Sequence, residues 1–293
     1  MKVLITGING FVGKYLEKIL IEKGYRVYGI DLKNNNRENI FECDLKDPKR
    51  LESIILETEP EFIFHLAAIS KTTFQDFKEI YEINVNGTLN LLNSCLKLEK
   101  KPKIIFISSS HVYGNVSSKK IKETTLTRPY NHYGASKLMG EALCWAFFNQ
   151  YNLPILILRA FNHTGPSQPI DFLIPKLINC FKNRLPTINL GNIDITREFI
   201  DVRDVVNIYV KVIENYIPGK VYNVSSGRGY KISSIIKLLQ KITSHKPNIV
   251  ISKELIRENE PAIQIGDNTE LMKVINYKFN YDIKKTLVDM INN

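Results

Sequence analysis

The sequence predicts an α/β fold: a Rossmann-like, doubly wound parallel sheet with a smaller C-terminal α/β substrate lobe. Short apolar runs rich in β-branched residues, beginning with Val3–Thr6, alternate along the chain with stretches of helical spacing. Turns rich in glycine, alanine or serine follow several of these runs. Because ligands of such sheets bind beyond the carboxyl ends of the strands, we expect those turns to form one binding edge.

The first of these turns has the spacing of a dinucleotide-binding loop. Residues 7–13 read Gly-Ile-Asn-Gly-Phe-Val-Gly, a relative of the G-x-G-x-x-G fingerprint. Gly7 permits the tight turn, Gly10 lets backbone amides approach a pyrophosphate, and Gly13 lets the next helix, about residues 10–23, pack closely. The positive end of that helix suits phosphates; a glycine turn without a ligand is the alternative. The expected cofactor contacts are Gly7, Asn9, Gly10, Phe11, Val12 and Gly13.

An acidic residue, Asp31, follows the second predicted strand. It lies 24 residues after Gly7 (31 − 7 = 24), near the spacing of about 20 expected for an acid that binds the ribose. A carboxylate there accepts from the 2′-hydroxyl and repels a 2′-phosphate, so NAD(H) is favoured. NADP(H) stays open because Lys33 and Arg37 follow closely, and a solvated acid at the strand end is the alternative.

Composition bounds the class of protein. A chain of 293 residues with 44% hydrophobic and 24% charged residues fits one α/β domain with a lobe, or two modest domains. The net charge of +10 suits an anionic ligand such as a nucleotide diphosphate. It is spread along the chain without an Arg-rich stripe, so we expect no nucleic-acid partner. We also expect no membrane span and no signal peptide.

The cysteines indicate a reducing compartment. Four are scattered along the chain, with neither a C-x-x-C pair nor histidines at zinc spacing. We therefore expect reduced thiols, a cytoplasmic protein and no metal site. They are Cys43, Cys95, Cys144 and Cys180.

Later strands extend the expected cofactor edge. The third ends in Glu42–Leu45, which would put Asp44 near the adenine. The fourth runs through Phe62–Ala68, and its small residues leave room for a cofactor to lie on the backbone, while His65 is expected to be structural. The cofactor contacts expected from these two strands are Asp44, Leu45, Leu66, Ala67 and Ala68.

Tyr133 and Lys137 stand four residues apart on a predicted helix, so their side chains share a face. An ammonium beside a phenol favours the phenolate and lowers its pKa, giving an acid/base for a sugar or alcohol oxygen. The spacing also occurs by chance on many helix surfaces. Here the order favours catalysis, because the pair follows the glycine loop and the serine run Ser108–Gly114.

These motifs, in this order, closely resemble the nucleotide-sugar branch of the extended short-chain dehydrogenase/reductase family. The resemblance covers the first half of the chain and implies an NAD(P)-dependent oxidoreductase with catalytic Ser109, Tyr133 and Lys137. Ser109 would bind the reacting oxygen, and Tyr133 would exchange its proton. Lys137 would lower the tyrosine pKa and reach the nicotinamide ribose, and Tyr133 would also contact the cofactor. The matching pieces are Gly7-x-x-Gly10-x-x-Gly13, His65-Leu-Ala-Ala, Asn84-x-Asn86-Gly-Thr, Ser108–Gly114 and Tyr133-x-x-x-Lys137.

Segments of the second half favour a GDP-linked substrate. Residues 161–168, Phe-Asn-His-Thr-Gly-Pro-Ser-Gln, resemble reductases acting on GDP-4-keto-6-deoxymannose, and residues 190–194 and 197–204 resemble a run those enzymes share with GDP-mannose dehydratases. Arg197 and Arg257 would bind the diphosphate, because guanidinium forks suit paired phosphate oxygens. His163 would either assist proton transfer or order its loop. The expected substrate contacts are Ser109, Ser110, His111, Asn162, His163, Arg197 and Arg257.

We therefore expect a reductase that delivers hydride to carbon 4 of a nucleotide-linked 4-keto sugar, a 6-deoxy-hexose or a heptose. In the resembling 4,6-dehydratases an acid precedes Val112, where this chain has His111. In the 3,5-epimerase/reductases the serine run holds a cysteine, where this chain has Ser110. A 4-epimerase would use the same triad. A non-catalytic redox-sensing binder and a nucleic-acid binder are the rival classes outside this chemistry.

Two domains and a homodimer complete the expectation. Residues 1–160 with 197–224 would form the NAD(P)-binding Rossmann domain. Residues 161–196 with 225–293 would form the nucleotide-sugar-binding lobe. The resembling family often dimerises by packing the helix after Asn84 and the Tyr133 helix into a four-helix bundle. The apolar residues Leu92, Leu138, Leu143 and Phe147 suit this, although core packing predicts the same pattern.

Overall fold

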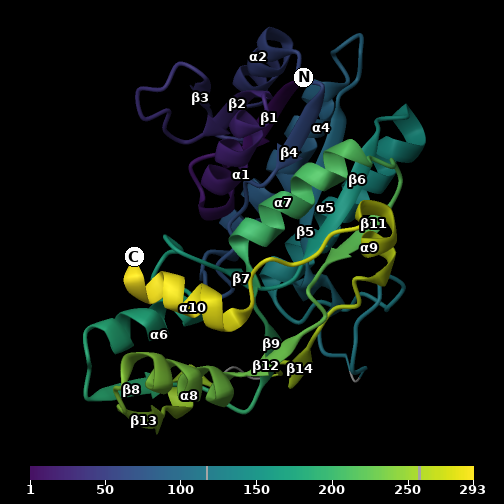
Figure 1. Ribbon diagram of the computed structural model, residues 1–293. Helices are drawn as coiled ribbons and strands as arrows, with labels where there is room; N and C mark the ends of the chain where they lie inside the picture. Colours follow the sequence, from purple (N-terminus) through teal and green to yellow (C-terminus); the bar gives the residue numbers. More distant parts are fainter. Residues whose placement is uncertain (117, 257–258) are drawn as a thin grey trace. The chain divides into compact units, whose positions relative to one another are not determined.

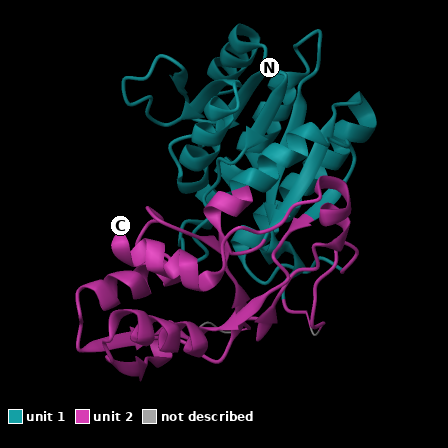
Figure 2. Ribbon diagram, in the orientation of Figure 1, with its two compact units in different colours: residues 1–114, 126–160, 206–222 teal, residues 115–125, 161–205, 223–293 magenta. Residues whose placement is uncertain are grey.

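The computed structural model describes residues 1–116, 118–256 and 259–293, which form two compact units (Figure 1, Figure 2). The first unit comprises residues 1–114, 126–160 and 206–222. The second comprises residues 115–125, 161–205 and 223–293. Segments 115–125 and 197–205 thus belong to the second unit, whereas the sequence analysis assigned them to the first domain. Hydrogen bonds explain why residues 115–125 belong with the second unit. The Asn223 amide donates to the Glu123 side chain (2.8 Å), and the Asn223 side chain donates to the Ile121 carbonyl (2.9 Å).

The core of the first unit is a seven-stranded parallel sheet, which confirms the predicted fold class. Its spatial order is β11-β6-β5-β4-β1-β2-β3, so the chain changes direction across the sheet between β1 and β4. The carboxyl edge at such a switch point is where doubly wound sheets bind their ligands. The strands are β1 (Lys2–Thr6), β2 (Arg26–Asp31), β3 (Ile40–Glu42), β4 (Phe62–His65), β5 (Lys103–Ser109), β6 (Ile155–Ala160) and β11 (Val221–Val224), the last ending in the second unit.

Helices cover both faces of this sheet because strand side chains alternate between the faces. Leu4, Ile63 and Phe106 lie on one face, in a core shared with helices α2 (Pro48–Thr58), α4 (Gly87–Cys95) and α5 (His132–Tyr151). Phe64 points to the other face, where its ring stacks 5.9 Å from that of Tyr209 in α7 (Val202–Glu214). The remaining helices of this unit are α1 (Phe11–Glu22), α3 (Phe77–Tyr81), the π-helix η1 (Glu82–Asn86) and the short η2 (Ser110–Tyr113).

Local sequence sets the ends of the helices. The Asn131 side chain accepts from the Gly134 amide (2.7 Å) and begins α5, while Asn152 ends it in the left-handed conformation. Asp47 caps α2 in the same way, followed by Pro48 in the first turn. The Asn131 cap fixes where α5 begins, so that Tyr133 is the second residue of this helix.

The second unit is a small α/β lobe, as the sequence predicts. Its apolar core joins α6, α8 and α10 to β8, and the buried Asp204 carboxylate ties the chain before α10 by accepting from the Tyr277 hydroxyl (2.6 Å) and the Asn280 amide (3.0 Å). The elements are β7 (His163–Thr164), α6 (Leu173–Lys182), β8 (Thr187–Leu190), β9 (Thr196–Glu198), β10 (Ile200–Asp201), β12 (Gly229–Lys231), α8 (Ile232–Thr243), β13 (Asn248–Ile251), η3 (Lys253–Leu255), β14 (Ile263–Gln264), α9 (Thr269–Ile275) and α10 (Ile283–Asn292).

The structure also gives observations on the cysteines and on the length and apolar character of the helices. All four cysteines are buried free thiols. None of the helices in the described part of the chain combines the length and apolar character that a bilayer crossing requires.

Candidate active site

The glycine loop between β1 and α1 is folded tightly against its neighbours. Gly7 has a φ of +72°, and a Cβ there would lie 3.0 Å from the Cα of Ala67. A Cβ at Gly13 would lie 2.4 Å from the Gly7 carbonyl oxygen. A side chain at Gly7 would therefore meet the alanine turn after β4, and a side chain at Gly13 would meet the backbone of the glycine loop itself. The glycine-loop residues and Ala67, all of which are expected to contact the cofactor, thus lie side by side.

The start of α1 has the properties of an anion site. Gly10 is its N-cap and supplies no side-chain hydrogen bond, and the first turn, all of it described, holds no acidic residue. The amides and the positive dipole end of a 12-residue helix are thus not compensated by its own side chains. This environment, beside a loop with no Cβ at three positions, fits the pyrophosphate of a dinucleotide.

Asp31, the last residue of β2, is joined to the glycine loop. One carboxylate oxygen accepts from the Asn9 amide (2.9 Å) and the other from the Leu32 amide (2.8 Å). The Asn9 side chain in turn donates to the Lys33 carbonyl (2.6 Å). Because each carboxylate oxygen has a second lone pair, Asp31 retains acceptor capacity for a ribose hydroxyl.

The other expected cofactor residues have different surroundings. Asp44 accepts from the Lys46 amide (2.9 Å), and its carboxylate lies 3.5 Å from the Lys46 ammonium. Leu45 is buried in the core, and its carbonyl accepts from Asn90 of α4 (2.8 Å). Leu66, Ala67 and Ala68 are half-buried in the turn after β4.

His65 is a buried structural residue. Its Nδ1 lies 2.7 Å from the Thr6 hydroxyl and its Nε2 lies 3.0 Å from the Thr88 hydroxyl, so the ring links β1 to α4. Burial, aided by the charge of Lys137, lowers the pKa of His65 to about 3. The ring is therefore neutral at physiological pH.

Ser109 and Tyr133 are neighbours in the first unit, and the Ser109 side chain influences the pKa of Tyr133. Ser109 ends β5, and its hydroxyl accepts from the His111 amide (3.2 Å). Burial raises the pKa of Tyr133, and the hydrogen bond with the Ser109 side chain lowers it in part. The half-buried tyrosine thus keeps its phenolic proton at neutral pH, and Ser109 is the neighbour that lowers its pKa.

Lys137 lies one helical turn after Tyr133 on α5. Its ammonium donates to the Ile107 carbonyl (2.8 Å) and lies 5.1 Å from the centre of the Phe106 ring. Burial lowers the pKa of Lys137 to about 8, while Cys144 and Glu141 raise it. The sequence analysis expected Lys137 to lower the tyrosine pKa, whereas the hydrogen bond from Ser109 is the lowering influence in this structure.

A buried ion pair behind the serine run is absent from the sequence analysis. Arg159, at the end of β6, donates from Nε (2.9 Å) and Nη2 (2.7 Å) to the Glu141 carboxylate, and from Nη1 to the Tyr113 hydroxyl (3.0 Å). Ser108 donates to the same carboxylate. Two signals point to it in the sequence: Glu141 lies four residues after Lys137, and Arg159 ends an otherwise apolar strand.

Asn84 is the second residue whose role the sequence analysis did not identify. It lies buried in η1, where its side chain exchanges hydrogen bonds with the backbone of Ile69 (2.8 and 3.0 Å) and donates to the Ser136 hydroxyl (2.9 Å). The widened turn of a π-helix often occurs at a functional site. Here it links the turn after β4 to the residue preceding Lys137.

Ser110 and His111 follow Ser109 in η2. Ser110 is buried. His111 is half-buried, with its Nδ1 3.1 Å from the Asn131 side-chain nitrogen and its ring edge-on to Tyr133 at 5.5 Å. Of the two, His111 is the one that contacts the ring of Tyr133.

The expected substrate residues of the second unit lie in two segments. Asn162 accepts from the Ile200 amide through its carbonyl (2.9 Å). His163 contacts the Phe161 carbonyl through Nδ1 (3.1 Å), and burial lowers its pKa. Arg197 is buried and pairs with the Glu260 carboxylate (3.2 Å). Arg257 lies outside the described residues.

Glu198, next to Arg197, is a buried carboxylate that organises its surroundings. It accepts from the Ser225 hydroxyl (2.7 Å) and from the amides of Gly227 (2.8 Å) and Gly266 (2.9 Å). Burial nonetheless raises its pKa. These contacts hold two segments distant in sequence, residues 225–227 and 266, against β9, and they explain why residues 197–205 belong to the second unit.

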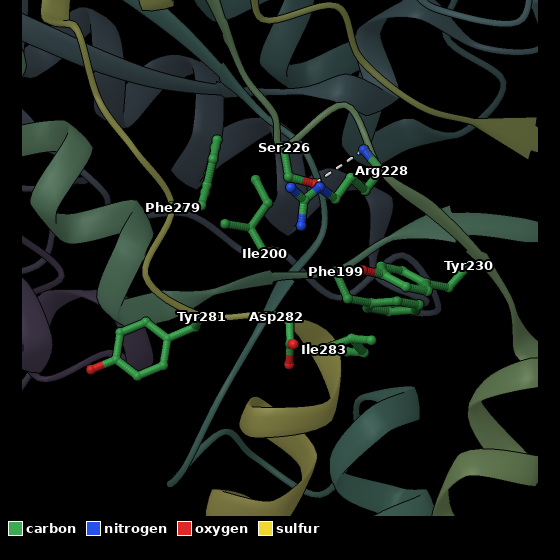
Figure 3. A pocket seen from close by; sticks show the side chains of 9 residues that line it. All are labelled: Phe199, Ile200, Ser226, Arg228, Tyr230, Phe279, Tyr281, Asp282 and Ile283. Atoms are coloured by element: carbon green, nitrogen blue, oxygen red, sulfur yellow. Dashed lines mark hydrogen bonds between the residues drawn. The ribbon is translucent and has the colours of Figure 1, made fainter.

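A small cavity of the second unit does not provide a substrate site. It holds only about 10 Å³, roughly one water-sized sphere. Figure 3 shows Arg228 and Asp282 among the side chains around it. The lining residues are Phe199, Ile200, Ser226, Arg228, Tyr230, Phe279, Tyr281, Asp282 and Ile283.

A glycine loop at a helix N-terminus, together with a serine that ends a parallel strand and a tyrosine and lysine on the neighbouring helix, defines a dinucleotide-dependent oxidoreductase. The model of the GDP-mannose 4,6-dehydratase family matches residues 4–290. The chain belongs to this family, within the nucleotide-sugar branch of the extended short-chain dehydrogenases/reductases, and is an NAD(P)-dependent enzyme.

Individual relatives match over almost their whole length. GDP-6-deoxy-D-talose 4-dehydrogenase of Aggregatibacter actinomycetemcomitans is 33% identical over 299 residues, covering 100% of this chain and 98% of the relative. GDP-6-deoxy-D-mannose reductase of Pseudomonas aeruginosa is 31% identical, covering 98% and 94%. The solved structure of RMD from Pseudomonas aeruginosa complexed with NADPH has a TM-score of 0.89 at 30% identity, covering 99% and 97%.

Proposed function

We propose that this enzyme reduces the 4-keto group of a GDP-linked 4-keto sugar, a 6-deoxy-hexose or a heptose. The observation that carries the proposal is that Ser109 and Tyr133 are neighbours, with Lys137 one helical turn further along α5. Two relatives named for GDP-6-deoxy sugars, a 4-dehydrogenase and a reductase, support the substrate class.

Each of these residues has a separate role in the proposed reduction of the ketone. The glycine loop and Asp31 would hold a nicotinamide cofactor, which when bound would supply the hydride for sugar carbon 4. Tyr133 gives its phenolic proton to the carbonyl oxygen, which becomes the new hydroxyl. Ser109 donates a hydrogen bond to the same oxygen as negative charge develops on it. Because its pKa is about 8, Lys137 can return a proton to the phenolate near neutral pH.

The serine run argues against dehydration as the main reaction. A 4,6-elimination needs an acid/base aligned across the carbon 5–carbon 6 bond. Residues 108–114 contain no carboxylate, and the expected acid position holds His111. Because a histidine such as His111 can also transfer protons, the substrate assay should also look for epimerised and dehydrated products.

The test is to incubate the enzyme and NADH with GDP-, dTDP-, UDP- and CDP-linked 4-keto sugars and to identify each product by NMR. We expect NADH consumption and a 4-hydroxy product with the GDP-linked sugar. Tightly held NAD with no net NADH consumption would identify a 4-epimerase instead. Turnover of only the other nucleotides would overturn the GDP assignment.

Arg197 and Arg257 are proposed to bind the substrate diphosphate. For Arg197 the proposal rests on the resemblance of residues 197–204 to the run shared with GDP-mannose dehydratases, since its guanidinium is buried and paired with Glu260 in this structure. For Asn162 and His163 we propose roles in the segment that follows β6. The contact of His163 with Phe161 favours ordering of the loop over proton transfer.

We further propose that NADH is the preferred cofactor, and Asp31 tests this. Asp31→Ala should raise the NADPH/NADH ratio of kcat/KM about tenfold or more, because the carboxylate that repels a 2′-phosphate is gone. Steady-state kinetics with both cofactors measures the ratio. Glu42→Ala, which removes an exposed acid at the end of β3, is the matched control. An unchanged ratio would show that Asp31 does not face the ribose.

A homodimer through α5 is also proposed. The helix has 20 residues, and its only charged side chains, Lys137 and Glu141, are both buried. Its exposed residues carry no charge: His132, Met139, Ala142, Ala146, Asn149, Gln150 and Tyr151. An uncharged stripe along five turns suits packing against the same helix of a second copy.

Met139→Glu tests this interface. The side chain is 47% exposed, and a carboxylate there would be buried without a partner in the dimer. We expect the mass in sedimentation equilibrium to fall from two chains to one. Ile21→Glu, a similar change at a 52% exposed residue of α1, should keep the dimer. A monomeric wild-type protein would contradict the proposal.

A further inference from the structure

Helix α1 contains a buried acid that the catalytic mechanism does not use. Glu17 is 6% exposed on a face otherwise lined by Gly13, Leu16 and Leu20. A buried carboxylate is costly unless a cation neutralises it. The cation is Arg37, whose guanidinium pairs with the Glu17 carboxylate.

Arg37 lies in the loop between β2 and β3, shortly after Asp31. The backbone around it is fixed by two turns, with the Arg37 amide donating to the Asn34 carbonyl (3.1 Å) and the Ile40 amide donating to the Arg37 carbonyl (3.1 Å). The start of the same loop is tied to the glycine loop through Asn9 and Lys33. The pair therefore links the segment after the ribose-binding position to the helix that follows the glycine loop.

The chemistry of the pair bears on cofactor choice. A 2′-phosphate adds negative charge at the adenosine ribose, and a guanidinium is the side chain best suited to bind it. Arg37 is the only arginine in residues 32–39. The guanidinium contacts the Glu17 carboxylate through Nη2, so its charge is compensated there, while the Arg37 side chain as a whole is 38% exposed.

We propose that the Glu17–Arg37 pair is a determinant of cofactor selectivity that withholds Arg37 from a 2′-phosphate. The proposal rests on the NADH preference proposed above. It assigns that preference to two acids: Asp31, which repels the extra phosphate directly, and Glu17, which occupies the nearby cation. A purely structural pair would hold the loop in place but would not discriminate between the two cofactors.

The test measures cofactor affinity without turnover. Isothermal titration calorimetry with NADPH and with NADH should show that Glu17→Gln tightens NADPH binding about fivefold or more, since a freed ion pair is worth about that factor. The affinity for NADH should change less than about twofold. Adding Arg37→Ala to Glu17→Gln should abolish the gain. Glu22→Gln, which alters an exposed acid of the same helix, should leave both affinities unchanged.

A second variant at the same position keeps the inference testable if Glu17→Gln does not fold. Glu17→Leu fills the same buried position with an apolar side chain and also frees Arg37, so it should reproduce the gain in NADPH affinity. Unchanged NADPH affinity in folded Glu17→Gln and Glu17→Leu would overturn the inference. If Asp31→Ala still shifts selectivity in that case, only the role of Glu17 falls. If Asp31→Ala also has no effect, the NADH preference itself falls.

Discussion

Tyr133→Phe is expected to lower kcat about 10²–10⁴-fold, the usual contribution of a positioned general acid. The substitution removes only the hydroxyl, so the ring keeps its edge contact with His111. The new alcohol oxygen then has no phenolic proton donor. Single-turnover oxidation of NADH with a 4-keto sugar measures the loss.

Cofactor affinity separates catalysis from folding in this experiment. Calorimetric binding of NADH should stay within about threefold of wild type, because the glycine loop and Asp31 are unchanged. Tyr151→Phe, at the far end of α5, removes an exposed hydroxyl and should keep full turnover. Full turnover by Tyr133→Phe on a verified substrate would remove this tyrosine from the mechanism.

Arg159→Met should lower the free energy of unfolding by about 3–5 kcal/mol, because it leaves Glu141 as an uncompensated buried charge. The two side chains are 9% and 3% exposed, so solvent screens the loss little. Three donors of the guanidinium are removed at once, two from Glu141 and one from Tyr113. Urea denaturation followed by circular dichroism measures the difference.

Two further variants show whether burial of the charge is the cause. Glu141→Leu combined with Arg159→Met should lose less stability than Arg159→Met alone, because an apolar pair leaves no charge behind. Lys211→Met breaks a pair whose side chains are 44% and 40% exposed and should cost less than about 1 kcal/mol. Equal losses for Arg159→Met and Lys211→Met would mean that the buried pair contributes no more than a surface pair.

Local sequence was enough to predict the α/β fold and the family, both of which are confirmed. Each strand of the main sheet is a short apolar run, and the helices α1 and α5 near the site have a glycine or a capping asparagine at their start. These signals act over a few residues, so a single chain reveals them. The order of the glycine loop, serine run and Tyr133 pair then identified the family.

Contacts between residues distant in the sequence could not be predicted from local sequence patterns. Arg159 and Glu141 are 18 residues apart on different elements, and nothing in either local pattern requires them to meet. Asn84 reaches Ser136 across 52 residues from a π-helical turn that resembles an ordinary helix start in sequence. Glu198 joins residues 225–227 and 266, which moved the unit boundary away from the expected position.

The sequence by itself determined the sheet, the glycine loop, and the presence of serine, tyrosine and lysine in the family order, because each depends on the conformational preferences of neighbouring residues. Only the tertiary structure decided the ionisation of those groups, because desolvation and hydrogen bonding depend on what is packed around them. Burial raises the pKa of Tyr133 and lowers that of Lys137 to about 8, and the fold brings the Arg37 guanidinium to the Glu17 carboxylate of α1.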